Sequence, residues 1–139
     1  MQLEQVYKDA ENQGARIFPW NIGFADAATI EINGKYGIFI DFARCRSMQD
    51  YAWKLAHEVS HCATGCTHSL ASSYDLIEKH EYKANRRQIE TYLPLESLNT
   101  AIQKGYREPW QLAEYFGVPE YAICRAVHYW RDIRECKIG

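Results

Sequence analysis

The chain has 139 residues, of which 47% are hydrophobic and 24% are charged, and its formal net charge at pH 7 is −2. This length and composition suit a soluble domain that buries its own core, and the many aromatic residues argue against a disordered chain. The near-neutral charge gives no general attraction to nucleic acid or to anionic membranes.

The N-terminal residues, the hydropathy and the cysteines together favour a cytoplasmic protein without membrane association. The segment MQLEQVYKDAENQG has an early glutamate and no apolar block, so we expect no secretory signal. No apolar run approaches the roughly 18 residues of a membrane span. The cysteines are odd in number and scattered, which favours reduced thiols over a disulfide framework. They are Cys45, Cys62, Cys66, Cys124 and Cys136.

The N-terminal part of the chain is expected to form a helix and then a hairpin. Apolar residues at helical spacing predict a helix over residues 2–13, and Gly14 is a suitable stop. The next segment, FPWNIGF, contains proline and glycine and is expected to be irregular. Apolar and polar residues then alternate over 28–41 around Asn33 and Gly34, which predicts a β-hairpin.

The side-chain pattern of this hairpin favours a three-residue loop, 33–35. Such a loop pairs Ile32 with Tyr36, so that apolar side chains face each other across the strands. A two-residue loop would instead set Ile32 against Lys35. We therefore expect the longer loop.

Helical periodicity dominates the rest of the chain. It predicts five further helices, at about residues 48–64, 75–92, 95–104, 109–115 and 119–134. Ser47 can cap the first of these, Gly65 follows its end, and the second stops before Pro94. A helix, a hairpin and then a run of helices indicate an α+β fold that is mostly helical. No repeat or linker divides the sequence, so we expect residues 1–139 to form a single domain.

The stretch YAWKLAHEVSHCATGCTH contains an H-E-x-x-H motif. On a helix, His57 and His61 project from one face one turn apart, so both imidazoles can reach one metal ion. Glu58 lies about 100° around the helix from His57, where it can reach a water at the metal. The arrangement is typical of zinc hydrolases, in which the metal acidifies a water and the glutamate accepts its proton. We therefore expect Zn²⁺, although such ligands also bind Mn²⁺ or Fe²⁺.

Three sources of a third metal ligand are open. His68 nearly completes the H-E-x-x-H-x-x-G-x-x-H pattern of metzincins, but His68 and Gly65 each lie one position late and no Met-turn follows. Cys62 and Cys66 could form a structural zinc site with the histidines, but Cys62 points away from the histidine face of the helix. The third candidate is Glu81, on the next long helix.

A carboxylate from Glu81 would complete a site with two neutral ligands and one anionic ligand. Such a site keeps a net positive charge and an open fourth position, both of which catalysis requires. Asn85, one turn later, could orient Glu81 or a bound water. Glu78 and His80 are neighbouring rivals, and a solvated helix face is the alternative without a metal.

The two motifs together resemble those of a known family. LAHEVSHCATG followed by EYKANRRQIETYLP resembles the ImmA/IrrE metallopeptidases, whose pattern is H-E-x-x-H and then, on a following helix, E-x-x-A-[DN]. Glu81, Ala84 and Asn85 match the second motif without a gap, and the similarity extends over about residues 36–131. One departure is Ser60, where the family often has glycine.

The resemblance implies that His57, His61 and Glu81 are zinc ligands and that Glu58 is the general base. It also implies a minimal zincin-like fold, in which a β-hairpin or small antiparallel sheet flanks the active-site helix. The metallopeptidase core would occupy about residues 1–104. The implied function is that of a prophage or integrative-element endopeptidase, an anti-repressor that cleaves a helix-turn-helix repressor.

The C-terminal region, about residues 105–139, contains a pair of helices like a helix-turn-helix. Ala113, Gly117 and Ile123 fall where that motif has a small residue, a turn glycine and a core aliphatic residue. Basic and acidic residues are nearly equal in number there, and Glu120 begins the second helix. Phosphate binding needs an excess of basic residues on one face, so we expect no direct nucleic acid binding. We expect the pair to pack on the core and to form a partner-binding surface.

Several choices are open at this point. The oxyanion could be stabilised by Tyr74, Tyr82, Tyr92 or His68. The hairpin edge could bind a protein substrate as an added strand. Alternative functions are a metal-containing protein that relieves a repressor by contact without cleavage, and a DNA-binding helix-turn-helix protein. The oligomeric state is also open.

Overall fold

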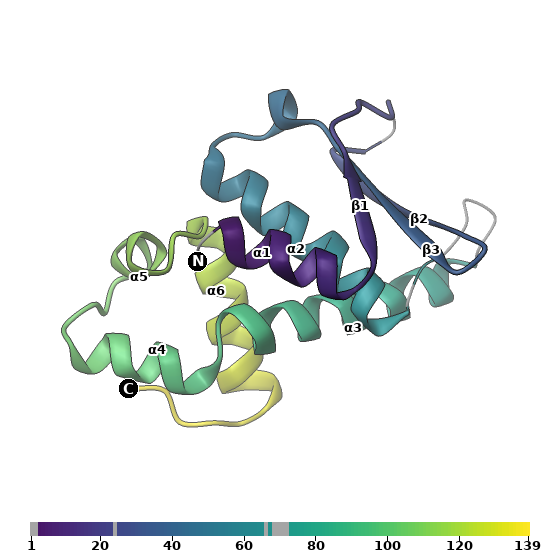
Figure 1. The fold of residues 1–139 in the computed structure, drawn as a ribbon. Helices are drawn as coiled ribbons and strands as arrows, with labels where there is room; N and C mark the ends of the chain where they lie inside the picture. Colours follow the sequence, from purple (N-terminus) through teal and green to yellow (C-terminus); the bar gives the residue numbers. More distant parts are fainter. Residues whose placement is uncertain (1–2, 24, 66, 68–72) are drawn as a thin grey trace. The chain divides into compact units, whose positions relative to one another are not determined.

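The computed structural model describes residues 3–23, 25–65, 67 and 73–139 of the chain. These residues form six α-helices and one three-stranded sheet, which confirms the predicted α+β class with helix in the majority (Figure 1). Among them, no helix combines the length and the apolar character needed to cross a membrane. The chain divides into two compact units, residues 2–87 and residues 88–139.

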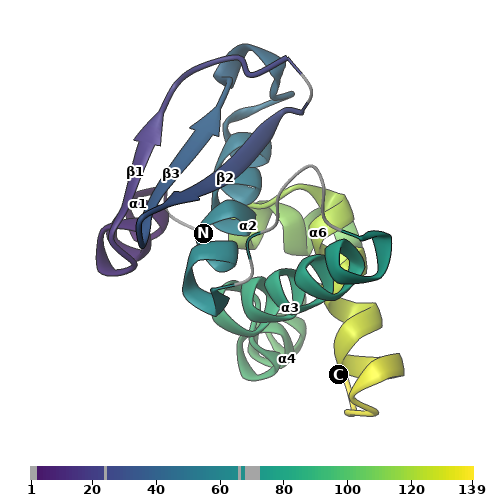
Figure 2. The same cartoon turned by 90° about the vertical axis from the view of Figure 1, so that its right-hand side faces the viewer.

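Strand β3 (Lys35–Ile40) lies at the centre of the sheet in the N-terminal unit. Strand β2 (Ala27–Ile32) pairs antiparallel with β3 to form the predicted hairpin, and β1 (Ala15–Phe18) pairs parallel with β3 on its other side (Figure 2). The sequence analysis missed β1, and the sheet is mixed instead of antiparallel. A strand of four residues carries too little alternation to be recognised, and this one is stabilised by pairing with β3.

The loop of the hairpin is shorter than predicted. Ile32 pairs with Lys35, which leaves a two-residue loop of Asn33 and Gly34. Both loop residues have positive φ, 53° and 77°, as a type I′ turn requires. The predicted three-residue loop, 33–35, is therefore wrong, because the twist of an Asn-Gly turn matches the strands and sets the register. The side chain of Ile32 is 66% exposed, so burial of this residue does not determine which residue it pairs with across the hairpin.

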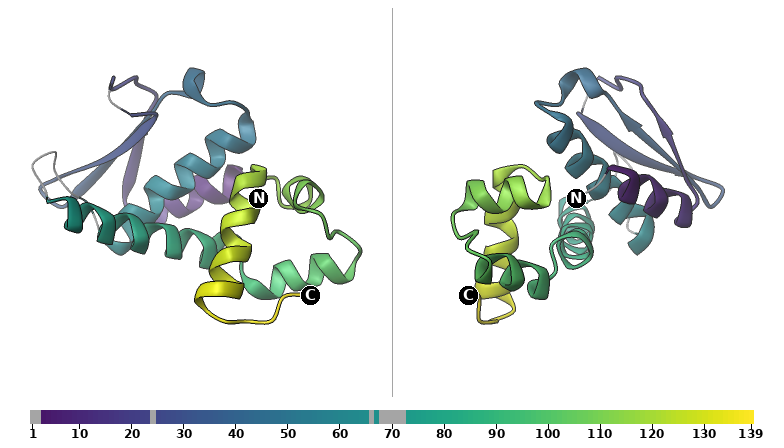
Figure 3. Two further views of the ribbon diagram at one scale, coloured as in Figure 1. Left: turned by 180° about the vertical axis from the view of Figure 1, so that it is seen from behind. Right: turned by 60° about the vertical axis from the view of Figure 1, so that its left-hand side comes forward.

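Helices α1 (Leu3–Asn12) and α2 (Met48–Thr64) lie on one face of the sheet (Figures 1 and 3). A short 3-10 helix, η1 (Phe42–Arg44), precedes α2. The Ser47 hydroxyl accepts the backbone N–H of Asp50 at 3.1 Å, and Gly65 ends α2 in the left-handed conformation, so both predicted boundaries are confirmed. The buried core of this unit includes Val6, Ala10, Ile38, Ile40, Leu55, Ala56 and Val59.

Helix α3 (Tyr74–Tyr92) begins in the N-terminal unit and ends in the C-terminal unit. The boundary between the units therefore falls inside a helix, earlier in the chain than residue 104, where the sequence analysis placed the end of the core. The last turns of α3 belong with the helices that follow. The hydroxyl of Tyr129, for example, donates a hydrogen bond to the carboxylate of Glu90.

The C-terminal unit continues with α4 (Leu95–Gln103), α5 (Pro109–Phe116) and α6 (Glu120–His128). Gly117 ends α5 with φ of 67°, so a short turn joins the two helices that the sequence analysis paired. The last predicted helix is α-helical only as far as α6, and a π-helical turn, η2 (Tyr129–Ile133), continues it.

The C-terminal tail returns to α4 (Figure 3). The side-chain amide of Asn99 donates to the carbonyl of Lys137 at 3.5 Å, and its oxygen accepts the backbone N–H of Gly139 at 2.9 Å. These bonds hold the end of the chain against the other helices of its own unit.

Candidate metal centre

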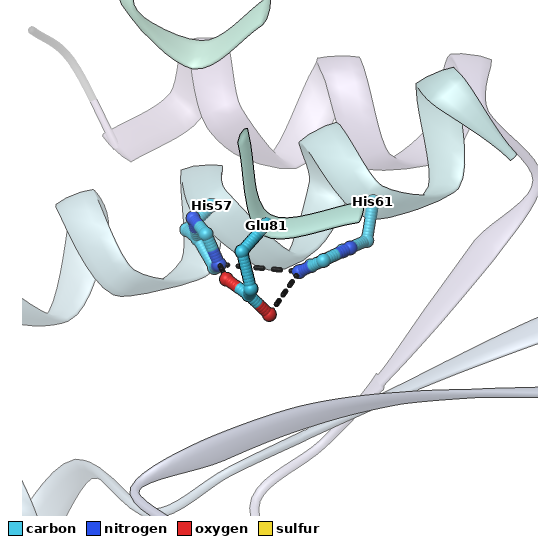
Figure 4. Close-up of side chains that lie close together, drawn as sticks. All are labelled: His57, His61 and Glu81. Carbon is cyan, nitrogen blue, oxygen red and sulfur yellow. Dashed lines mark hydrogen bonds and ion pairs between the residues drawn. The ribbon is translucent and has the colours of Figure 1, made fainter. Parts of the chain in front are cut away.

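His57, His61 and Glu81 converge on one point in the N-terminal unit (Figure 4). The two histidines lie one turn apart on α2, and their Nε2 atoms are 3.2 Å from each other. Glu81 extends from α3, with Oε2 at 2.8 Å from Nε2 of His57 and Oε1 at 3.1 Å from Nε2 of His61. The structure therefore brings together the three residues that the sequence predicted as metal ligands.

The three contacts cannot all be hydrogen bonds at once. The histidine–histidine contact needs one Nε2 without a proton, whereas each contact with an ionised Glu81 needs an Nε2 that donates one. A single cation removes this conflict, because both imidazole lone pairs and the carboxylate can point at it. Two atoms that each lie about 2.0–2.1 Å from a tetrahedral ion are about 3.3 Å apart, close to the observed separation of the imidazoles. The donor set fits one divalent metal ion.

The cluster is buried on one side and open on the other. The side chain of His61 is 5% exposed, that of His57 is 21% exposed, and that of Glu81 is 40% exposed. Hydrogen bonds from His57 and His61 lower the pKa of the Glu81 carboxyl, so this group is ionised as a metal ligand must be. A ligand set that borders solvent in this way is compatible with a further, exchangeable ligand.

Glu58 lies on α2 next to the first histidine, but it is not part of the ligand cluster. It is 8% exposed. The hydroxyl of Thr29 on β2 donates to Oε1 of Glu58 at 2.9 Å and lies 3.2 Å from its backbone carbonyl oxygen. A buried carboxylate with one fixed donor has a restricted orientation, as a general base needs.

The sequence analysis missed Thr29. A signal was present, since Thr29 alternates with apolar residues on β2 and is a polar residue directed at the helix side of the sheet. Which helical residue it would meet depended on how α2 crosses the sheet, and no local pattern specifies that crossing.

Of the other candidates for a third ligand, those within the described residues do not join the cluster. Cys62 is buried, and burial together with the charge of Glu58 raises the pKa of its thiol to about 12, so the thiol is protonated. Glu78 is exposed, and the hydroxyl of Tyr74 shares a hydrogen bond with it. Cys66 and His68 lie outside the described residues.

Asn85 and three tyrosines were also predicted to have roles at the site. Asn85 is half-buried and lies one turn after Glu81. The hydrogen bonds of the Glu81 carboxylate within the described residues lead to His57 and His61. Tyr74 and Tyr82 are 73% and 51% exposed, whereas Tyr92 is a buried residue of the C-terminal unit. Their proposed roles towards Glu81 or an oxyanion stay predictions.

Comparison of the chain with protein-family models, with curated proteins and with solved structures gives no match.

Replacement of Glu81 by alanine should greatly reduce the metal content of the purified protein. The native chain is expected to carry close to one equivalent of zinc, because three convergent ligands bind it, and Glu81→Ala leaves only two. Elemental analysis measures the molar ratio of zinc to protein, with Glu78→Ala as the matched control on the same helix. Equal zinc in the native chain and Glu81→Ala would contradict this ligand set.

Proposed function

We propose that the protein is a zinc-dependent endopeptidase. The observation that carries the proposal is the convergence of Glu81 with His57 and His61, beside a buried carboxylate at Glu58. Two neutral ligands and one anionic ligand are the set typical of catalytic zinc in peptidases, whereas structural zinc sites are usually closed by four ligands. The partial exposure of Glu81 supports an open site.

The two carboxylates have separate tasks in this proposal. Bound zinc would supply Lewis acidity, which acidifies a water and polarises the peptide carbonyl. Glu81 holds the metal together with the histidines. Glu58 accepts the proton of the attacking water and returns it to the leaving amine. Thr29 holds the Glu58 carboxylate in position through Oε1.

The edge of the sheet supports a peptide substrate. β2 is an outer strand of the described sheet, and its Thr29 contacts Glu58. An extended peptide can add to such an edge through main-chain hydrogen bonds. A peptide added along the outer edge of β2 would run close to the general base.

The motifs and the α+β fold support a zincin-like arrangement of the ImmA/IrrE type. The proposed substrate, a helix-turn-helix repressor of a mobile element, rests on that resemblance alone. In the C-terminal unit, exposed residues of α6 carry mixed charge, with Glu120 at its start and Arg125 further along. This mixture supports a protein partner over DNA.

Replacement of Glu58 by glutamine should abolish cleavage without loss of the metal. The amide keeps the shape of the side chain but cannot accept the proton, so we expect cleavage to fall by about 10²- to 10⁴-fold. Fragments of a candidate repressor are measured by mass spectrometry, with Glu11→Gln, an exposed change on α1, as the control. If Glu58→Gln relieves repression as well as the native chain does, the protein acts by contact and not by proteolysis.

Replacement of Thr29 by valine should slow cleavage while zinc binding stays unchanged. Valine keeps the shape but removes the donor to Glu58, and a hydrogen bond to a charged group contributes about 1.5–3 kcal/mol, or roughly 10- to 100-fold in rate. Thr29→Ser keeps the hydroxyl and should keep most of the activity. Initial cleavage rates and zinc content are measured for both variants. A valine variant as fast as the native chain would remove Thr29 from the mechanism.

A further inference from the structure

Arg87 on α3 forms a bidentate ion pair with Asp9 on α1. Nη1 lies 2.7 Å from Oδ2 of Asp9, and Nη2 lies 2.9 Å from Oδ1. The side chains are 22% and 14% exposed, so water screens the pair only weakly. Parallel bonds from a planar guanidinium to a carboxylate fix direction as well as distance. This pair ties α3 to α1.

Ser60 brings α2 to the same guanidinium. Its side chain is fully buried, and its hydroxyl donates to the carbonyl of Ala56 at 2.8 Å. Because that bond uses the only hydroxyl proton, Oγ acts as an acceptor towards Nη1 of Arg87, at 3.4 Å. Ser60 directly precedes the ligand His61. Three helices of the N-terminal unit therefore meet at Arg87.

Arg87 and Glu81 lie on the same side of α3. Glu81, Ala84 and Arg87 follow at intervals of three residues, so they span about 120° of the helix and about 9 Å of its length. Ala84, between them, is fully buried, which places this side of α3 against the interior of the unit. Contacts at both ends of such a stripe fix the rotation of a helix and its position along its axis.

A metal ligand requires this kind of control. Side chains end about 5–6 Å from the axis of a helix, so a rotation of about 20° moves them by about 2 Å. Metal–ligand distances tolerate only about 0.2 Å. Glu81 alone cannot set its own approach to two imidazoles on another helix.

We propose that Arg87 is a positioning residue of the metal centre. Its guanidinium, held by Asp9 and Ser60, sets the rotation of α3 that brings the carboxylate of Glu81 to His57 and His61. The inference rests on the proposed metal site, and it assigns to Arg87 a role that neither motif contains.

The test compares metal binding by full-length native protein and Arg87→Lys. Lysine keeps the positive charge and much of the aliphatic chain but cannot form the bidentate hydrogen bonds of a guanidinium. We therefore expect the zinc Kd to rise about 10-fold or more, in the range found for outer-shell partners of metal ligands. Zinc affinity is measured by competition with a chromogenic chelator. The control is Lys83→Arg, an exposed change on the same helix, which should leave the Kd unchanged.

A second readout separates positioning from a general loss of stability. At saturating Co²⁺, visible absorption reports the geometry of the ion, and Arg87→Lys should give an altered spectrum because Glu81 is displaced. Arg87→Lys should also cost little further affinity in a Glu81→Ala background, because Arg87 acts through Glu81. If Arg87→Lys does not fold, Asp9→Asn, which leaves α3 unchanged, provides the same comparison.

The outcomes separate the inference from the function on which it rests. Native Kd and cobalt spectrum in both Arg87→Lys and Asp9→Asn would overturn the positioning role while the metal site stands. The positioning role would also be overturned if Arg87→Lys and Glu81→Ala had fully additive effects on the free energy of zinc binding. A native chain that binds neither zinc nor cobalt would overturn the metal site and this inference together.

Discussion

The approach of Glu81 to two histidines on another helix is the contact on which the candidate site depends. His57 and His61 are fixed to each other by their spacing on α2, so their relation needs no tertiary structure. Glu81 reaches them only if α3 crosses α2 at the observed place and with the observed rotation. Without an ion, the lone pairs and the carboxylate would be left with contacts that their protons cannot all satisfy. In the proposed metal site, metal binding and the crossing of the two helices would therefore stabilise each other.

Helix α2 uses each of its sides for a separate task. One side presents the imidazoles, a second presents Glu58 to Thr29, and a third presents Ser60 to Arg87. Most of the other buried residues of α2 are apolar and pack in the core, and buried Asp50 pairs with Lys54. Buried polar groups are costly without partners, and these three groups each have one. This division explains why 11 of the 17 residues of α2 are buried although the helix carries polar residues of the site.

Local signals carried most of what the sequence predicted correctly. Helix α2 begins after Ser47 and ends before Gly65, as predicted. An N-cap and a left-handed glycine act within a few residues of the chain, so the sequence alone reveals them. The spacing of the histidines and the match of Glu81 to a second motif predicted which three residues would lie together. The predicted hairpin was right in its strands and wrong in its loop, because the dihedral angles of Asn33 and Gly34 outweighed the side-chain pattern.

The features that the sequence did not predict depend on contacts between distant segments. The partners of Thr29 and Arg87 belong to other elements, so no window of sequence contains both members of either pair. Strand β1 is too short to be recognised without the strand that it pairs with.

The most direct test of this account is the position of zinc in crystals of the protein. Diffraction data collected on both sides of the zinc absorption edge locate the ion without assumptions about its ligands. The account predicts one anomalous peak about 2.0–2.2 Å from Nε2 of His57, Nε2 of His61 and a carboxylate oxygen of Glu81. A peak bonded to the sulfur of Cys62, or none between α2 and α3 while those side chains keep their positions, would contradict it.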